Sequence, residues 1–210
     1  MDNYDLQVDM AKRIFLQYDQ EKMIGKFALR FDEEWLYLTY LNTPLRIHRE
    51  DGRIEEFVLD VWCQCRKYTT VMTVYDLLCC NQGEKMPELS GQWCTVGTFI
   101  VAGITETEPF TEKYAQCFQG QLDKLRDACL ELGGVLQKPL AGADLTCLFY
   151  ATEFFPVLLQ FWDADEEFPA KLLILWDRNS HHFLRFETTF YLQGDLLQSL
   201  ENSMQNGAAS

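Results

Sequence analysis

The sequence predicts an α+β fold of antiparallel meanders flanked by helices, in a single compact unit. Two stretches, residues 2–18 and 111–132, carry apolar side chains three and four residues apart, as amphipathic helices do. Short runs of branched and aromatic residues follow each stretch, which is typical of strands. The connections between these runs are shorter than the dozen or more residues of a parallel crossover, so we expect antiparallel pairing.

The first half is expected to combine helices with a meander. Asp2 or Asn3 can cap the opening helix, because short polar side chains accept hydrogen bonds from the first helical amides. The segment Asn42-Thr43-Pro44 and the dipeptide Asp51-Gly52 are turn signals between strands. The expected elements are a helix over 2–18, a possible strand over 26–31, strands over 35–41, 45–49 and 53–59, and a helix over 68–80.

The second half has the same kind of pattern. Thr111 is the expected cap of a long helix, and Gly133-Gly134 is its expected end, since glycine readily adopts the left-handed conformation that closes a helix. The expected elements are a Gly-broken segment over 95–104, the helix over 111–132, strands over 145–150, 157–162 and 172–176, a helical turn over 180–183, and a final helix from about 187 to 203.

The chain is expected to form one α+β domain over residues 1–203. A loop over residues 84–92, with Pro87 and Gly91, is the best boundary between possible halves at 1–85 and 93–203. The two meanders could share one sheet. We expect a disordered tail over residues 204–210.

The charge balance excludes some partners. The chain has 210 residues, with 18 Lys and Arg against 32 Asp and Glu, for a formal charge of −14. Nucleic acid and anionic membrane surfaces repel such a chain, so we expect neither as a partner. We see neither a signal peptide nor an apolar run of membrane-spanning length, so we expect a soluble, cytoplasmic protein. Its eight cysteines then indicate reduced thiols.

An acidic connection follows the second strand of the second half. Asp163, Asp165, Glu166 and Glu167 lie within five residues, and converging carboxylates could hold a hard cation. Counted from Asp163, the spacing of Asp163, Asp165 and Glu167 resembles the start of a calcium-binding loop. Position six of such a loop would be Phe168 instead of glycine, and position twelve is not glutamate. The alternative is a solvated turn that only shapes the fold.

Histidines and cysteines give weaker patterns. His181 and His182 are adjacent, so a regular element would aim only one of them at a given site. That histidine could act as a base or a metal ligand, or it could simply cap a helical turn. The cysteine spacing matches neither zinc nor iron–sulfur sites, and no nucleotide-binding glycine motif is present. The sequence therefore assigns no cofactor.

A set of residues in the last third of the chain follows a family pattern. Its members are Gly133-Gly134, Pro139-Leu140, Gly142-Ala143-Asp144, Pro156, Trp162, residues 165–169, Asp177, His182 and Leu184. On these residues the chain resembles an uncharacterised family, domain of unknown function 3786, found mainly in anaerobic bacteria and archaea. The resemblance implies no activity. Some relatives join this domain to a four-cysteine iron–sulfur module, and this chain lacks that cysteine run.

Two functions from different classes follow. The first is a ligand- or partner-binding accessory module without catalysis, because a tryptophan beside carboxylates suits a cationic or planar ligand. The second is a divalent-metal-dependent enzyme that uses the acidic turn and a histidine. Candidate ligand-binding residues are Asp144, Trp162, Asp165, Glu166, Glu167 and His182, and candidate metal ligands are Asp163, Asp165, Glu167 and His182.

Overall fold

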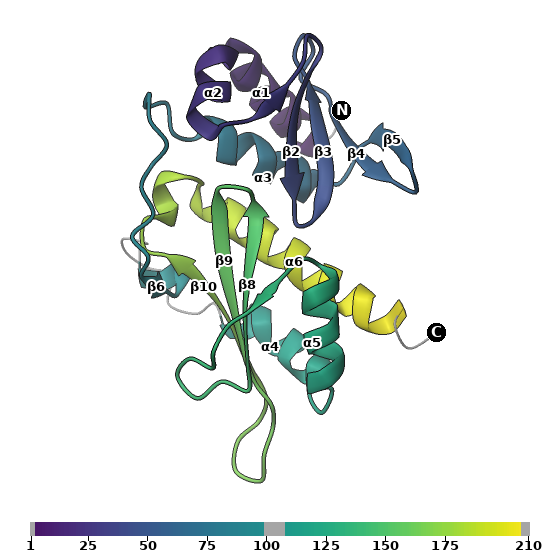
Figure 1. Cartoon of the computed structure of the whole chain (residues 1–210), viewed down its shortest axis with the longest axis vertical. Coiled ribbons are helices and arrows are strands. Elements are labelled where there is room, and N and C mark those ends of the chain that lie inside the picture. The colour runs from purple at the N-terminus through teal and green to yellow at the C-terminus, as the bar shows by residue number, and fades with distance from the viewer. Residues whose placement is uncertain (1–2, 99–107, 207–210) are drawn as a thin grey trace. The chain divides into compact units, whose positions relative to one another are not determined.

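The structure is a computed structural model that describes residues 3–98 and 108–206. These residues form six α-helices and two antiparallel sheets of five strands each, which confirms the α+β class (Figure 1). The chain divides into two compact units. The first unit comprises Met1–Leu89, Thr152–Phe154 and Asn179–Leu192, and the second comprises Ser90–Ala151, Phe155–Arg178 and Gln193–Ser210.

The sheet of the first unit is a simple meander, β1-β2-β3-β4-β5. Two-residue turns close two of its hairpins, and both turn residues have positive φ, at Leu41-Asn42 and again at Leu59-Asp60. The three predicted strands are confirmed. The sequence missed the fifth, because Leu59-Asp60 is not a typical turn dipeptide. The strands are β1 (Arg30–Phe31), β2 (Trp35–Tyr40), β3 (Thr43–His48), β4 (Ile54–Val58) and β5 (Val61–Gln64).

Three helices gather on one face of this sheet (Figure 1). They are α1 (Asn3–Gln17), α2 (Gln20–Phe27) and α3 (Tyr68–Cys79). Helix α1 packs against α3 and buries Phe15 completely. Helix α2 was not predicted. The Asp19 side chain caps it by accepting the amide of Lys22 at 3.2 Å, so the helix takes the start of the strand expected over 26–31.

The second unit has its own sheet, in the order β6-β10-β9-β8-β7. The two meanders therefore do not share one sheet. The three long central strands confirm the prediction, and β9 is buried along nearly its whole length. The strands are β6 (Trp93–Cys94), β7 (Val135–Leu136), β8 (Leu145–Thr152), β9 (Phe155–Trp162) and β10 (Lys171–Asp177).

The long helix expected over 111–132 is in fact two helices. Helix α4 (Glu108–Phe118) packs on β10, and α5 (Leu122–Glu131) packs on β7. Gly120 separates them with φ of +69°, a conformation that costs glycine little. Because α4 begins at residue 108, Thr111 is a buried helical residue instead of a cap. The expected end at Gly133 is confirmed, with φ of +76°.

Helix α6 (Phe186–Asn206) begins in the first unit and continues into the second. It extends three residues past the expected end and buries Met204, so residues 204–206 are not a tail. Short 3-10 turns occur at Val96–Thr98 and Ser180–His182. Asp2, part of the Gly-broken segment over 95–104 and residues 207–210 lie outside the described residues. Within the part that is described, no helix is long and apolar enough to cross a membrane.

Two glycines should respond differently to substitution by alanine. A Cβ at Gly120 meets no atom within 4 Å, so Gly120→Ala costs only backbone strain, roughly 1 kcal/mol. A Cβ at Gly134 would lie 2.5 Å from the Cys147 Sγ and 2.7 Å from the Cys129 carbonyl oxygen. We expect Gly134→Ala to cost more, about 1–3 kcal/mol of overpacking on top of any backbone effect. Urea unfolding of both variants measures the difference, and equal costs would contradict this packing.

Candidate functional site

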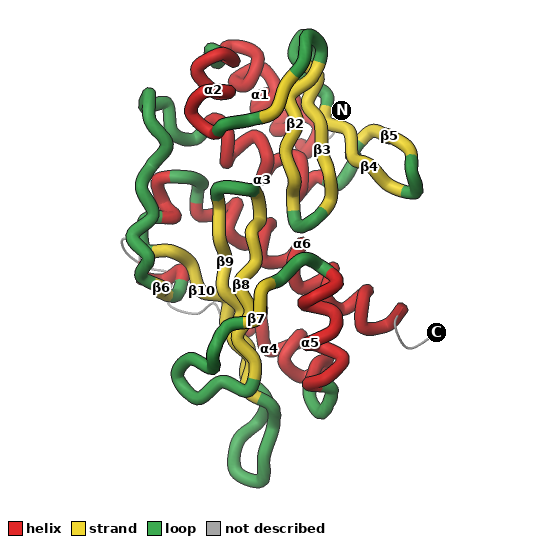
Figure 2. The backbone as a smooth tube through the Cα atoms, viewed as in Figure 1, coloured by secondary structure: helices red, strands yellow, loops and turns green. Residues whose placement is uncertain are grey.

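The second unit contains a cleft of about 840 Å³ between α4 and the β9–β10 connection. Four residues singled out in the sequence contribute to it: Asp144, Trp162, Asp163 and Asp165. Asp144 precedes β8, Trp162 is the last residue of β9, and Asp163 and Asp165 follow it, and the loops before β8 and after β9 lie at the same end of the sheet (Figure 2). The other lining residues are Thr111, Glu112, Ala115, Gln116, Gly142 and residues 168–173.

Helix α4 forms one wall of the cleft. Thr111 and Ala115 are buried, while Glu112 and Gln116 are exposed one position further along the helix. Thr111 and Ala115 are four residues apart and share one helix face, and Glu112 and Gln116 share the neighbouring face for the same reason. The sequence did not suggest Glu112, because its place in the cleft depends on the docking of α4 against β10.

The carboxylates of Asp163 and Asp144 hold the floor of the cleft together. The Asp163 Oδ1 accepts the amide of Gly120 at 2.8 Å and that of Ala164 at 2.9 Å. The Asp144 Oδ2 accepts the amide of Asp163 at 2.8 Å, and the Asp144 amide donates to the Phe161 carbonyl at 2.9 Å. The other oxygen of each carboxylate accepts no hydrogen bond from a described protein group. One oxygen of each carboxylate is therefore structural, and the second is not used in these hydrogen bonds.

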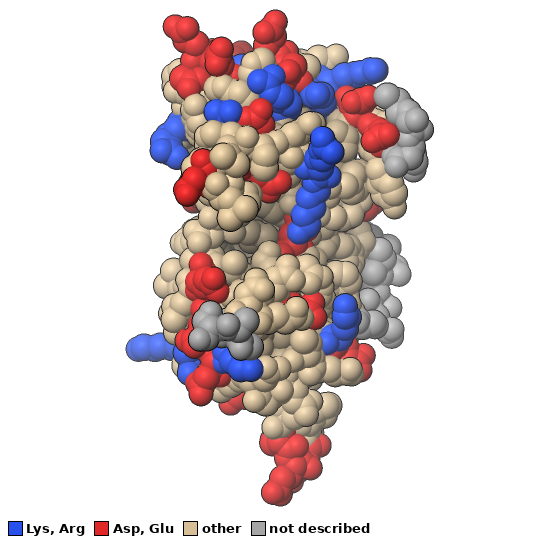
Figure 3. Space-filling model, turned by 90° about the vertical axis from the view of Figure 1, so that its right-hand side faces the viewer, with Lys and Arg blue, Asp and Glu red and all other residues tan. Residues whose placement is uncertain are grey.

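Asp165 organises the acidic turn. Its Oδ1 accepts the amides of Glu167 at 2.8 Å and Phe168 at 2.7 Å. These two hydrogen bonds hold the pKa of the Asp165 carboxyl below its usual value. Glu166 and Glu167 are exposed on the same turn but do not line the cleft. Acidic side chains gather visibly at this end of the second unit (Figure 3).

His182 lies in the first unit, on the 3-10 turn Ser180–His182. Its ring centroid is 3.9 Å from that of His181. Partial burial, and then the neighbouring His181, lower the pKa of His182. The structure thus puts Asp144, Trp162 and Asp165 around one cleft, Glu166 and Glu167 beside it, and His182 in the other unit. Their role in ligand binding remains a prediction.

None of the eight cysteines forms a disulfide with another described residue. Burial, with smaller effects of Asp76 and Cys80, raises the pKa of Cys79 to about 12, and burial also raises the pKa of Cys80. Both line a cavity of about 180 Å³ in the first unit as protonated thiols. Over residues 3–98 and 108–206, no three His, Cys, Asp or Glu side chains are grouped as metal ligands. The geometry therefore gives no support to a metal site built from Asp163, Asp165, Glu167 and His182.

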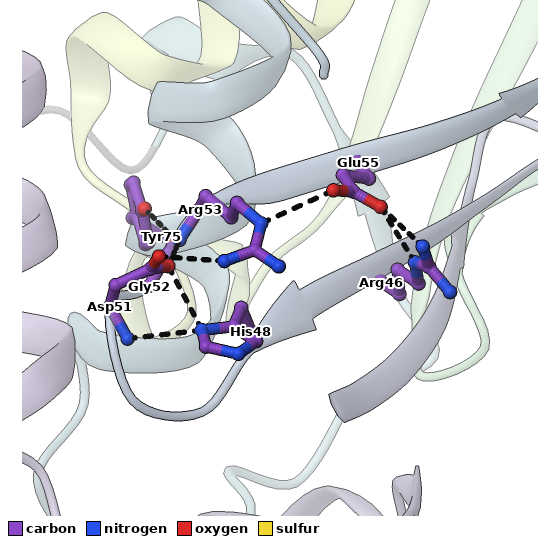
Figure 4. A network of polar contacts seen from close by, with 7 residues as sticks. All are labelled: Arg46, His48, Asp51, Gly52, Arg53, Glu55 and Tyr75. Atoms are coloured by element: carbon purple, nitrogen blue, oxygen red, sulfur yellow. Dashed lines mark hydrogen bonds and ion pairs between the residues drawn. The ribbon is translucent and has the colours of Figure 1, made fainter. Parts of the chain in front are cut away.

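A second polar cluster, which the sequence did not reveal, covers the outer face of the first sheet (Figure 4). Arg46 donates from Nε and Nη2 to the Glu55 Oε2 at 2.8 and 2.5 Å. Its guanidinium carbon lies 3.9 Å from the Trp35 ring centroid and 4.5 Å from that of Trp62. Such stacking of a guanidinium on aromatic faces adds cation–π attraction to the ion pair.

Arg53 extends this cluster toward the β3–β4 turn. It bonds the second Glu55 oxygen at 3.2 Å and Asp51 at 2.7 Å, and Asp51 in turn lies 3.1 Å from the His48 Nδ1. At the same turn, the buried Tyr75 hydroxyl donates to the Gly52 carbonyl. The charges of this cluster neutralise one another, so we interpret it as structural.

The second unit thus defines a class: an α+β protein with an acidic, tryptophan-lined cleft at one end of an antiparallel sheet. The family model for a domain of unknown function (DUF3786) matches residues 10–199, so the chain belongs to that family. No curated protein and no solved structure is significantly similar to the chain.

The Arg46–Glu55 cluster predicts a pH-dependent stability. Burial alone would raise the pKa of Glu55, but the hydrogen bonds from Arg46 and Arg53 outweigh it and lower the pKa. A carboxyl group whose pKa is lower in the folded state stabilises the fold fully above its unfolded pKa of about 4.3. This stabilisation is lost as the pH falls through the pKa of the folded state. Wild type should therefore lose more stability between pH 5 and pH 3 than Glu55→Gln, as measured by urea unfolding.

Glu56 provides the matched control for this measurement. It is next to Glu55 on β4, and its carboxylate forms no ion pair within the described residues. The free energy of unfolding of Glu56→Gln should change with pH as that of wild type does. If the free energies of wild type and Glu55→Gln fell in parallel with pH, the proposed role of the cluster would be contradicted.

Proposed function

We propose that the protein is a binding module without catalysis, and that its cleft takes a small, planar organic cation. One observation carries the proposal: Trp162 and the carboxylates of Asp144, Asp163 and Asp165 surround a single cleft. An aromatic face and carboxylates together favour a cation, because the ring attracts positive charge and the oxygens accept its N–H groups.

The size of the cleft supports a small molecule. Its volume of about 840 Å³ falls within the range of roughly 300–1,000 Å³ that is usual for small-molecule sites. Phe168 adds an apolar surface at the rim, where it is 65% exposed.

The charge of the lining supports a cation over an anion. Glu112 and the three aspartates face the cleft, and Lys171 is the one basic residue among its described lining residues. Histidine, the most frequent general acid–base residue, is absent from that described lining. The excess of carboxylates over basic groups supports a cationic ligand.

The cysteines and the net charge support a cytoplasmic location and limit the possible partners. None of the eight cysteines is in a disulfide among the described residues, which suits the reducing cytoplasm of an anaerobic organism such as the family resemblance implies. The formal charge of −14 argues against nucleic acid as a partner. We therefore place the proposed binding function in the cytoplasm, with a small cation or a protein as partner.

Benzamidinium and its neutral analogue benzamide test the proposal directly. The two probes have nearly the same shape, but only benzamidinium carries a charge. We expect isothermal titration calorimetry to detect benzamidinium and not benzamide. Asp144→Asn should weaken binding by roughly tenfold or more, because it removes a charge-assisted hydrogen bond of about 1.5–3 kcal/mol. Trp162→Leu should weaken it roughly 3- to 30-fold through lost cation–π attraction.

Glu166→Gln is the matched control for charge. Glu166 belongs to the same acidic turn but does not line the cleft, so this variant should bind benzamidinium as wild type does. Equal binding of both probes, equal effects of Asp144→Asn and Glu166→Gln, or displacement of benzamidinium by Ca²⁺ or Mg²⁺ would each contradict an organic-cation site.

A further inference from the structure

The outer edge of the first sheet offers an interaction surface that is independent of the cleft. Strand β5 ends the sheet, and no described strand pairs with its other side. Unpaired edges present backbone groups that invite pairing with another chain, and lysine or proline on the edge is among the features that prevent it. The β5 sequence Val-Trp-Cys-Gln contains neither lysine nor proline, and its first residue, Val61, is 58% exposed.

The register shows which backbone groups face the open edge. Cys65 donates its amide to the Ile54 carbonyl at 2.9 Å, in line with the pairing of Glu55 with Gln64 and Glu56 with Cys63. Hydrogen-bonded and non-bonded positions alternate along an antiparallel pair. Cys63 therefore directs its backbone groups toward β4, whereas Trp62 and Gln64 direct theirs toward the open edge.

We propose that β5 pairs with β5 of a second copy of this chain, in an antiparallel dimer centred on Cys63. In this register Trp62 of each copy is opposite Gln64 of the other, and both have outward-facing amide and carbonyl groups. The two pairs can therefore exchange backbone hydrogen bonds across the dimer.

Charge complementarity selects this register. Asp60, in the turn before β5, and Arg66, just after β5, flank the strand, and a two-fold axis at Cys63 brings the Asp60 end of one copy toward the Arg66 end of the other, on both sides of the axis. Both residues are exposed, and neither forms an ion pair within the described part of the chain. Opposite charges that approach one another across a dimer attract, so the charges flanking β5 are complementary to those of its own antiparallel copy.

The apolar tip of the β4–β5 hairpin supports the same partner. Phe57, Val58 and Leu59 are 36%, 40% and 91% exposed. Exposed apolar groups of this size commonly mark contacts between proteins. In the proposed pairing, this tip lies beside the residues that follow β5 in the second copy.

Gln64→Pro tests the proposal in the full-length chain. Proline removes the outward-facing amide of Gln64 without removing an amide that bonds to β4. The loss of two hydrogen bonds per dimer should raise the dissociation constant roughly 30-fold in sedimentation equilibrium. Gln64→Ala keeps the amide and should leave the dimer intact. Arg66→Glu should weaken the dimer more than Lys67→Glu, because Arg66 is nearer to Asp60 in this register.

Cys63 gives a second readout, which does not depend on how Gln64→Pro folds. Facing residues at a non-bonded position have Cα atoms about 4.5 Å apart, within the range that a disulfide spans. Diamide should accept two electrons and two protons from the paired Cys63 thiols, becoming the hydrazine while the disulfide forms. The covalent dimer should disappear in Cys63→Ser and persist in Cys80→Ser.

The outcomes decide the proposal clearly. A dimer that Gln64→Pro weakens, with cross-linking that depends on Cys63, supports it. Three results would each overturn it: a monomer across the concentration series, a dimer that folded Gln64→Pro leaves unchanged, or cross-linking that survives Cys63→Ser. If circular dichroism shows that Gln64→Pro is unfolded, the Arg66→Glu comparison and the Cys63 cross-link decide.

Discussion

The hydrogen bond from the Gly120 amide to the Asp163 carboxylate is the contact on which the cleft depends. It joins the break between α4 and α5 to the end of β9, at 2.8 Å. Asp144 then accepts the amide of Asp163 at the same distance, which adds the loop before β8. A hydrogen bond to a charged group is worth about 1.5–3 kcal/mol, so two of them can fix three loops in place.

This arrangement gives each carboxylate two roles. One oxygen satisfies a backbone amide at a loop, where an unpaired amide would be costly. The other oxygen of each carboxylate accepts no hydrogen bond from a described protein group, and both residues line the cleft. Function can be built from structural carboxylates in this way, because holding the loop also holds the second oxygen in position. The acidic turn at Asp165 differs, since two backbone amides converge on one oxygen and the remaining glutamates point to solvent.

The sequence revealed the features that depend on local chemistry. Alternating branched residues and the Asp51-Gly52 turn were enough to place β3 and β4. The break at Gly120 could not be read in this way, because the apolar spacing continues from Phe118 to Leu125 and its partner Asp163 is 43 residues away. The pairing of Arg46 with Glu55 follows from the hairpin register, so it could have been found once that turn was located.

The candidate site was predictable only where it depends on local sequence patterns. Asp144 and Trp162 flank predicted strands, and strand ends that meet at one edge of a sheet bring such residues together. Glu112 depends on how α4 packs on β10, which no local pattern encodes. His182 was included because it belongs to the family pattern and a histidine can act as a base or a metal ligand, but its turn belongs to the other unit.

A crystal structure of the protein with benzamidinium tests the central claim most directly. The account predicts the amidinium nitrogens within about 3 Å of the Asp144 Oδ1 and Asp163 Oδ2, with the phenyl ring against Trp162. Both carboxylates should keep their hydrogen bonds to the loop amides in the complex. A probe bound elsewhere, or bound in the cleft without contact to either aspartate, would contradict it.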